Sequence, residues 1–339
     1  MGWLMPMPVA VAVLAVAALA VIVFGRRLAT VVDRLADRTG IGEALAGAVL
    51  LAAATSLAGL VASVTAASGG DAQLAVSNSI GGVGAQTAFL VVADLLHRGA
   101  NLEHAAASIT NVFSALLMTV MLGIVVIGMA TSTTSVWDVH PASLFLPLVY
   151  GYGLWLSRRV SQEPMWRATR TPQTRVETPD STAARGSLTT MWLSFALFAV
   201  LVSAAGFAVA RAGVSLAEAS GLSSTFIGAF ITSIVTSMPE LVTTVAAVRA
   251  GALSLAVGGI VGGNAFDLLF VAASDVAYRD GGIYAAMGAS DMFLVGWTIL
   301  LVGTAAAGLV RREPTGIGFE GYSILAIYAA GVAVLGVLG

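Results

Sequence analysis

The chain has 339 residues, of which 58% are hydrophobic and only 10% are charged, with a net charge of −2. A soluble globular protein is about 25% charged, so this composition excludes a soluble enzyme and gives no reason to expect a nucleic-acid partner. The chain contains no cysteine, which excludes disulfides, thiolate metal sites and sulfur nucleophiles.

Apolar runs long enough to cross a bilayer recur along the whole chain and predict an all-α polytopic membrane protein of about ten transmembrane helices. In chain order the expected spans are residues 6–24, 40–68, 72–96, 106–130, 141–157, 188–210, 219–248, 252–276, 283–309 and 321–338. The first is interpreted as a retained span, because no small-residue cleavage site precedes a polar domain. Spans 40–68 and 219–248 are too long for one straight crossing, and each contains a Thr-Ser pair where a break is expected.

The polar segment 158–187 divides the chain into two predicted five-helix halves, residues 1–157 and 188–339. Its Arg, Thr and Pro content is typical of a flexible linker. If the N-terminus lies outside, all but two of the 16 arginines fall on the inside. Positive residues concentrate on the cytoplasmic side of membrane proteins. We therefore predict an external N-terminus and a cytoplasmic linker, in a bacterial or archaeal plasma membrane.

An internal repeat changes the interpretation of these spans. Residues 40–94 match residues 221–275 without a gap, at a constant offset of 181 positions. Glycines alone could reflect helix packing, but polar residues travel with them. The matched polar and glycine pairs are Thr55-Ser56 with Thr236-Ser237, Gly81-Gly82 with Gly262-Gly263, and Asp94 with Asp275. Because five spans separate the copies, they cross in opposite senses and predict an inverted repeat, the architecture of secondary transporters with a site near the midplane.

The second copy carries a carboxylate in the middle of an apolar span. Glu240 is a functional candidate because an acid at that depth is costly. Pro239 lacks an amide hydrogen, so it leaves carbonyls of the preceding turn without a donor. Together with the hydroxyls of Thr236 and Ser237, these oxygens form the ligand set that a hard cation such as Ca²⁺ or Na⁺ prefers.

The next span supplies a second acid. Asn264 and Asp267 lie three residues apart and so share one helical face. Gly262 and Gly263 are expected to let the facing helix approach closely, so that Asp267 and Glu240 meet at one ion. Two other acids have different expected roles: Asp94 and Asp275 lie near span ends and are interpreted as interfacial or capping residues.

These residues resemble the α-repeat of the calcium/cation antiporter superfamily, which includes sodium/calcium and proton/calcium exchangers. The resemblance covers Thr-Ser-x-Pro-Glu, the later Gly-x-x-x-Gly-x-Asn-x-x-Asp, and the five-plus-five layout with its central linker. It implies alternating access, inorganic cations as partners in a lipid bilayer, transported Ca²⁺, Na⁺ or H⁺ at the site, and no cofactor. It makes Thr236, Ser237, Glu240 and Asp267 the candidate ion ligands.

The first copy departs from the family pattern. Ala58-Gly59 stands where a Pro-Glu pair is expected, and Val83 matches Asn264. Thr55 and Ser56 are kept, and Gln86 offers a neutral amide oxygen opposite Asp267. The first half therefore contributes hydroxyls, carbonyls and Gln86, but no charge.

Only two acids remain at the expected site, and their charge of −2 is balanced by one Ca²⁺, two Na⁺ or two H⁺. Losing one carboxylate should weaken divalent binding, so a monovalent cation/H⁺ exchanger stays an alternative to a Ca²⁺ antiporter. A non-transporting scaffold or sensor is a third hypothesis. An enzyme is not expected, because the chain shows no Gly-x-Ser-x-Gly nucleophile elbow and its three histidines fall in predicted loops. The oligomeric state is left open.

Overall fold

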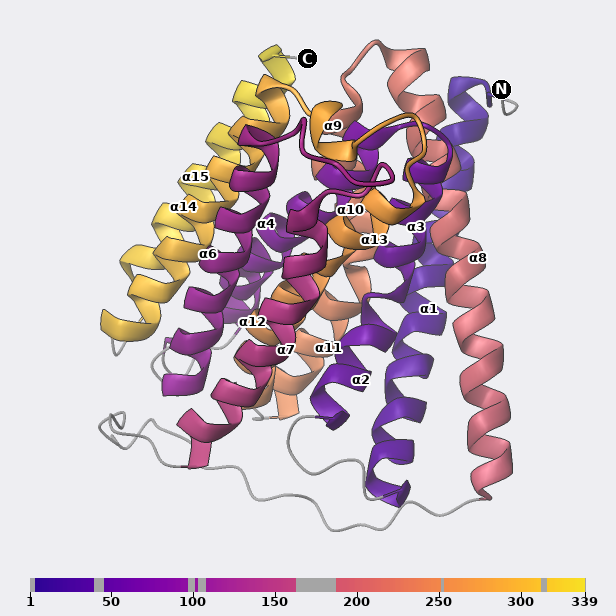
Figure 1. The fold of residues 1–339 in the computed structure, drawn as a ribbon. Coiled ribbons are helices and arrows are strands. Elements are labelled where there is room, and N and C mark those ends of the chain that lie inside the picture. The colour runs from indigo at the N-terminus through magenta and orange to yellow at the C-terminus, as the bar shows by residue number, and fades with distance from the viewer. Residues whose placement is uncertain are drawn as a thin grey trace.

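The computed structural model describes residues 4–39, 46–96, 101–102, 108–162, 187–250, 253–311 and 316–338, and this part of the chain is helical (Figure 1). Its elements in chain order are α1 (Met7–Thr39), α2 (Ala46–Thr55), α3 (Leu57–Ser68), α4 (Ala72–Leu96), α6 (Ile109–Ala130), α7 (Pro141–Gln162), α8 (Leu188–Ser220), α9 (Ser224–Phe226), the π-helical η1 (Ile227–Thr232), α10 (Ser233–Thr236), α11 (Met238–Ala250), α12 (Leu253–Asp267), α13 (Leu269–Ala277), the 3₁₀ turn η2 (Ile283–Ala285), α14 (Ala289–Arg311) and α15 (Gly318–Leu338). Most of the predicted linker and residues 40–45 of the second predicted span lie outside the described residues.

The described helices account for most of the predicted spans. Seven of them are long and apolar enough to cross a membrane, and the pair 224–236 and 238–249, bent by 46°, raises the number to eight. The α7 helix and the α2–α3 pair are not among them. The ten-span count therefore stays a prediction, with α7 and α2–α3 as the elements that would complete it.

Several predicted helix ends are wrong. The α1 and α8 helices have 33 residues each and run well past the predicted ends at residues 24 and 210. The apolar run stops there, but arginine and alanine are good helix formers, so the helix continues beyond it. The α8 helix ends where Gly221 adopts a left-handed φ of 73°. The α14 helix begins at Ala289 and not at the predicted residue 283, since Ile283–Ala285 form the separate 3₁₀ turn η2.

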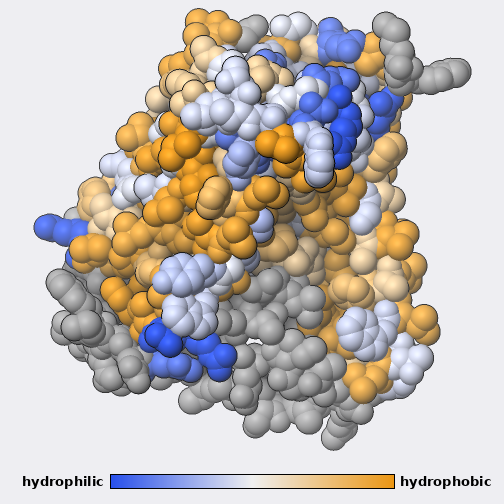
Figure 2. Space-filling view, viewed as in Figure 1, coloured by the Kyte–Doolittle hydropathy of each residue, from blue (hydrophilic) through white to orange (hydrophobic). Residues whose placement is uncertain are grey.

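An apolar belt crosses the face of the bundle that Figure 2 shows. Figure 2 shows hydrophobic side chains across the middle of the described surface and hydrophilic ones toward its two ends. Large apolar side chains point outward in this belt, including Val16 at 71% exposure and Leu148 at 66%. Exposed aliphatic surface on this scale is stable only in lipid, as expected of an integral membrane protein.

The two expected Thr-Ser breaks are confirmed. The α2 helix ends at Thr55 and α3 begins one residue after Ser56, while α10 ends at Thr236 and α11 begins after Ser237. In Figure 1 the α2–α3 pair leads away from the end of the bundle where α7 stops, and the α10–α11 pair leads toward it. The two broken helices thus run in opposite directions, as an inverted repeat requires.

Close helix contacts occur at other glycines than those expected. A Cβ at Gly81 would overlap the backbone of Ala229, so α4 and η1 touch main chain to main chain. Nothing lies within 4 Å of a Cβ placed at Gly262, and one at Gly263 would make an ordinary contact with Gln86. The expectation of close approach at Gly262 and Gly263 is therefore wrong, because these glycines face open space and a flexible side chain.

The capping interpretation of the two terminal acids is confirmed. Asp94 accepts a hydrogen bond of 2.6 Å from the amide of Leu102, and Asp275 accepts one of 3.3 Å from the amide of Ile283. Each bond spans eight residues, and the two pairs are again 181 positions apart. Asp275 also accepts the amide of His140 at 2.7 Å. Through these bonds Asp94 connects α4 with Leu102, and Asp275 connects α13 with Ile283 and His140.

Candidate cation-binding site

A small polar cavity lies where α3, α4, the α10–α11 break and the end of α12 meet. Its volume is about 10 Å³, room for about one water molecule. Its lining residues are Ser56, Gly59, Asn78, Gly82, Thr236, Ser237, Glu240, Asp267 and Phe270. Both copies of the sequence repeat therefore contribute to one cavity.

The two predicted acids share this cavity and are buried. Glu240 is 5% exposed and its Oε1 accepts a hydrogen bond of 3.0 Å from the Ser56 hydroxyl. Asp267 is 3% exposed and its Oδ2 accepts one of 2.5 Å from the Gln86 amide. The same amide donates to Ser237 at 3.2 Å. Each acid from the second copy is thus held by a neutral donor from the first.

Four buried side-chain oxygens around these bonds have no hydrogen-bond partner. They are Gln86 Oε1, Glu240 Oε2, Asn264 Oδ1 and Asp267 Oδ1. A buried acceptor without a donor is costly, and folded proteins pair nearly all such groups. Four on adjoining helices make a region that is rich in acceptors and poor in donors. A cation placed among these oxygens would remove this deficit, because it interacts with several oxygens at once.

The hydroxyls and the amide of three other predicted ligands donate hydrogen bonds to groups other than the two acids. The hydroxyl of Thr55 donates to Leu51 and Ala52 carbonyls, and that of Thr236 donates to the Ser233 carbonyl. Hydroxyls in helices often make such bonds to the preceding turn, which leaves their lone pairs available. Asn264 lies against α4 instead, where its amide donates to the Val83 carbonyl and to Thr87 at 3.4 Å each.

Three residues of the cavity lining, Asn78, Gly82 and Phe270, were not predicted from the sequence. A signal for two of them was present. Asn78, Gly82 and Gln86 lie four residues apart in turn, which places them on one face of α4. The break at Leu268, directly after Asp267, was also missed, because no proline or glycine marks it.

A wider pocket, which we call the vestibule, adjoins the cavity at Glu240. It has a volume of about 370 Å³ and is lined by α2, α6, α7, α11 and α12. Its polar lining consists of Thr55, Thr110, Asn111, Ser114, Tyr150, Ser157, Glu240, Thr243 and Thr244. Glu240 lines both spaces.

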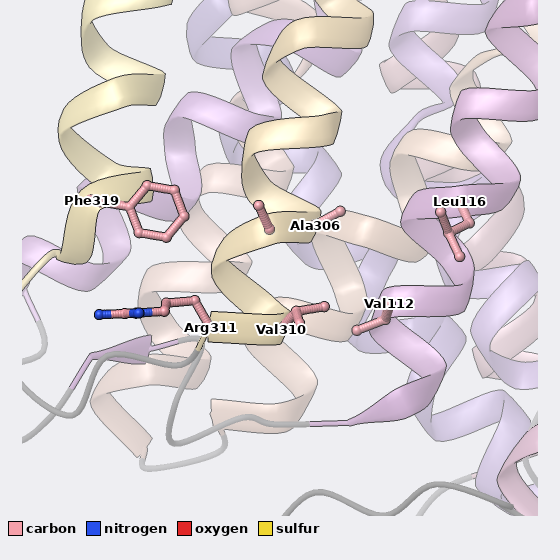
Figure 3. Close-up of a pocket in the computed structure, with 7 residues that line it drawn as sticks. Val112, Leu116, Ala306, Val310, Arg311 and Phe319 are labelled. Atoms are coloured by element: carbon pink, nitrogen blue, oxygen red, sulfur yellow. The ribbon is translucent and has the colours of Figure 1, made fainter.

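A second hollow faces the membrane and has a different character. It lies between α6, α14 and α15 and is lined by apolar side chains such as Val112 and Leu116, with Arg311 at its rim (Figure 3). No carboxylate lines it. It is therefore a groove in the lipid-facing surface and does not belong to the cation site.

Comparison with known proteins gives a consistent result. Residues 9–157 and 190–337 match the sequence model of the family described as sodium/calcium exchanger protein. The two blocks lie on either side of the segment predicted to be the linker. A relative, the putative antiporter CaxA of Alkalimonas amylolytica, is 25% identical over 280 residues, which are 82% of this chain and 84% of the relative.

Solved structures share the fold at low sequence identity. Native YfkE superposes with a TM-score of 0.67 at 16% identity and covers 98% of this chain and 97% of its own. The H⁺/Ca²⁺ exchanger CAX gives 0.65 at 14%, with 98% and 86% coverage. The sodium-calcium exchanger NCX_Mj gives 0.61 at 15%, with 96% and 98% coverage.

Proposed function

Because the chain belongs to the sodium/calcium exchanger protein family, we propose that it exchanges Ca²⁺ for Na⁺ or H⁺ at the cavity between Glu240 and Asp267. Membership of this family makes the protein a cation antiporter of the membrane and not an enzyme. What we propose beyond this is the identity of the ion, the residues that bind it and the stoichiometry of exchange. The candidate ligands are Glu240, Asp267, Thr236, Ser237, Asn264, Thr55, Ser56 and Gln86.

The observation that carries this proposal is the set of four unpartnered oxygens. Two belong to the carboxylates of Glu240 and Asp267, and two to the amides of Gln86 and Asn264. Carboxylate and amide oxygens are the ligands that Ca²⁺ prefers. With no cation bound, the carboxylates repel one another in a buried site. Binding of two protons or two Na⁺ relieves that repulsion as one Ca²⁺ does, so the competing ions exclude one another from a single site.

Charge balance sets the proposed stoichiometry. Two ionised carboxylates carry −2, so one Ca²⁺ or two monovalent cations neutralise the site in each half of the cycle. We therefore expect exchange of one Ca²⁺ for two monovalent cations, with no net charge moved. A third carboxylate at residue 59 would have changed this count, but the residue there is glycine.

The vestibule supports alternating access. It leads from Glu240 toward the end of the bundle where α7 stops at Gln162, directly before the predicted linker. With the linker in the cytoplasm, as the arginine distribution predicts, this conformation is open to the inside. Ten spans in two inverted halves would produce the outward-open state by exchanging the roles of the two broken helices.

Transport by the purified full-length chain in proteoliposomes tests the proposal. We expect ⁴⁵Ca²⁺ uptake driven by an outward Na⁺ or H⁺ gradient, at a rate that valinomycin and K⁺ clamping leave unchanged. Glu240→Gln keeps the shape of the side chain and removes its charge, so uptake should be lost. The matched control is Glu218→Gln, which alters an exposed residue at the end of α8 and should transport normally.

Other outcomes separate the alternatives. Full Ca²⁺ uptake by Glu240→Gln would refute the proposed site. Na⁺ or K⁺ exchange for H⁺ without Ca²⁺ uptake or Ca²⁺ competition would establish the monovalent exchanger instead. Absence of flux for Ca²⁺, Na⁺, K⁺ and Mg²⁺ at two pH values would support the scaffold hypothesis.

A further inference from the structure

Asn78 is buried at 2% exposure and lines the cation cavity from the first half of the chain. Its amide nitrogen donates to the carbonyl of Gly59 at 3.2 Å and to the hydroxyl of Ser63 at 3.0 Å. Its amide oxygen accepts the hydroxyl of Thr232 at 2.8 Å. One side chain on α4 thus connects α3 with η1 beside the cavity.

The chemistry of its partners fixes the orientation of this amide. The Gly59 carbonyl can only accept a hydrogen bond, so it requires the NH₂ group of Asn78. The flipped amide would set two oxygens against each other at 3.2 Å. The Asn78 NH₂ group therefore covers the carbonyl of Gly59, a backbone oxygen of α3 beside the cavity, in addition to the bond that such a carbonyl accepts from the next turn of its helix.

The repeat shows that this arrangement differs between the halves. At the offset of 181, Gly59 matches Glu240 and Asn78 matches Gly259. In the second half the broken helix carries the large acidic residue, Glu240, and the next helix carries the glycine, Gly259. In the first half the broken helix carries the glycine, Gly59, and the next helix carries the larger residue, Asn78. The large side chain is thus on the other helix in the first half, and it is a neutral amide where the second half has a carboxylate.

The position of the missing acid is also filled. A Cβ at Gly59 would lie 3.0 Å from Cε2 of Phe270 and 3.6 Å from Oγ1 of Thr236. A side chain there would require the aromatic ring to shift by a few tenths of an ångström. Phe270 therefore restricts any side chain at residue 59, and the polar side chains that the first half contributes to the cavity lining are those of Ser56 and Asn78.

We propose that Asn78 is a specificity-determining residue of the transport site, which keeps the first half uncharged and withholds the Gly59 carbonyl from the transported cation. This inference rests on the proposed function. Asn78 is a positioning residue, because it acts through the carbonyl it covers. Its consequence is a site whose negative charge comes from Glu240 and Asp267 alone.

Two substitutions test this role with the full chain in detergent and in proteoliposomes. Asn78→Asp is nearly isosteric and adds a third carboxylate, next to the uncovered Gly59 carbonyl. We expect the affinity for Ca²⁺, measured by titration calorimetry, to rise at least about tenfold relative to Na⁺, the size of one charge-assisted contact. Uptake of ⁴⁵Ca²⁺ should also become sensitive to the membrane potential, since a third charge has to be balanced. A purely structural residue would not produce that sensitivity.

Asn78→Ala removes the covering NH₂ group without adding charge. It should raise the preference for Ca²⁺ over Na⁺ less than Asn78→Asp does and leave transport electroneutral. The control is Ser63→Ala, which removes one acceptor of the amide and leaves the Gly59 bond in place. It should keep the wild-type ion preference.

The inference is overturned if folded Asn78→Asp keeps the wild-type ratio of Ca²⁺ to Na⁺ affinity within twofold and remains electroneutral. The same holds if Ser63→Ala changes the ratio as much as the Asn78 variants do. Loss of transport in Glu240→Gln together with either result rejects only the role of Asn78. Normal transport in Glu240→Gln rejects the proposed function itself.

Discussion

Asp267→Asn is the substitution whose effect on ion affinity follows most directly from the geometry. The side chain keeps its size and one oxygen, so the Gln86 amide retains an acceptor at residue 267. The change removes one of two charges in a cavity whose acids are 3% and 5% exposed. A bound Ca²⁺ would then leave a net charge of +1 where water cannot screen it.

The size of the effect follows from the cost of unbalanced charge. Removing one partner from a buried charged site costs about 3–5 kcal/mol, which corresponds to about two to three and a half orders of magnitude in the dissociation constant. Binding of a single monovalent cation should suffer less, because one carboxylate still balances it. Asp267→Asn should therefore lose Ca²⁺ affinity much more strongly than Na⁺ affinity.

Titration calorimetry with Ca²⁺ and with Na⁺ on the purified protein measures both affinities. Asp94→Asn is the matched control, because Asp94 is also a buried acid, at 4% exposure, but bonds the Leu102 amide and does not line the cavity. It should bind Ca²⁺ as the wild type does. If Asp267→Asn binds Ca²⁺ within about threefold of the wild type, well below the expected loss, Asp267 is not a ligand.

Two further pairs of substitutions test packing and access. Gly81→Ala places a Cβ 2.6 Å from the carbonyl oxygen of Ala229 and should cost about 1–3 kcal/mol of stability through overpacking. The control Gly262→Ala meets open space and should be neutral or stabilising. Equal melting temperatures of the two variants in detergent would contradict this expectation. Because the chain has no cysteine, a single introduced cysteine is the only thiol that a reagent can label. Leu154→Cys in the vestibule should react with a charged thiol reagent only from the side of the linker, and Trp137→Cys, at a position 91% exposed, only from the opposite side. Labelling of both variants from one side would refute the proposed access.

Much of the fold followed from local properties of the sequence. Long apolar runs predict membrane-spanning helices because the bilayer leaves the backbone no other way to satisfy its polar groups. The break at Ser237 was predictable since Pro239 cannot donate to the preceding turn, and the break at Ser56 followed by its match in the repeat. Helix ends were less predictable: α1 continues past Phe24 because the apolar run ends before the helical preference does.

The candidate site was likewise predictable from the sequence only in part. Glu240 and Asp267 stood out in the sequence because carboxylates are rare and costly within apolar spans, and the repeat matched Gln86 with Asp267 and Ser56 with Ser237. The sequence could not show that Ser56 donates to Glu240 or that Gln86 donates to Asp267. These bonds join residues more than 180 positions apart, and pairing over such a separation is decided by packing.

The sequence by itself determined the membrane class, the helical repeat, the two acids and the absence of a third, since each of these depends on residue type and spacing. The tertiary structure decided which neutral groups surround the acids. It placed the Asn78 amide against the Gly59 carbonyl and the Phe270 ring 3.0 Å from the position of a Cβ at residue 59. It also formed the vestibule beside Glu240, between α2, α6, α7, α11 and α12. The physical reason is that oxygens from four separate helices converge on one cavity, and only their packing decides which of them a cation can reach.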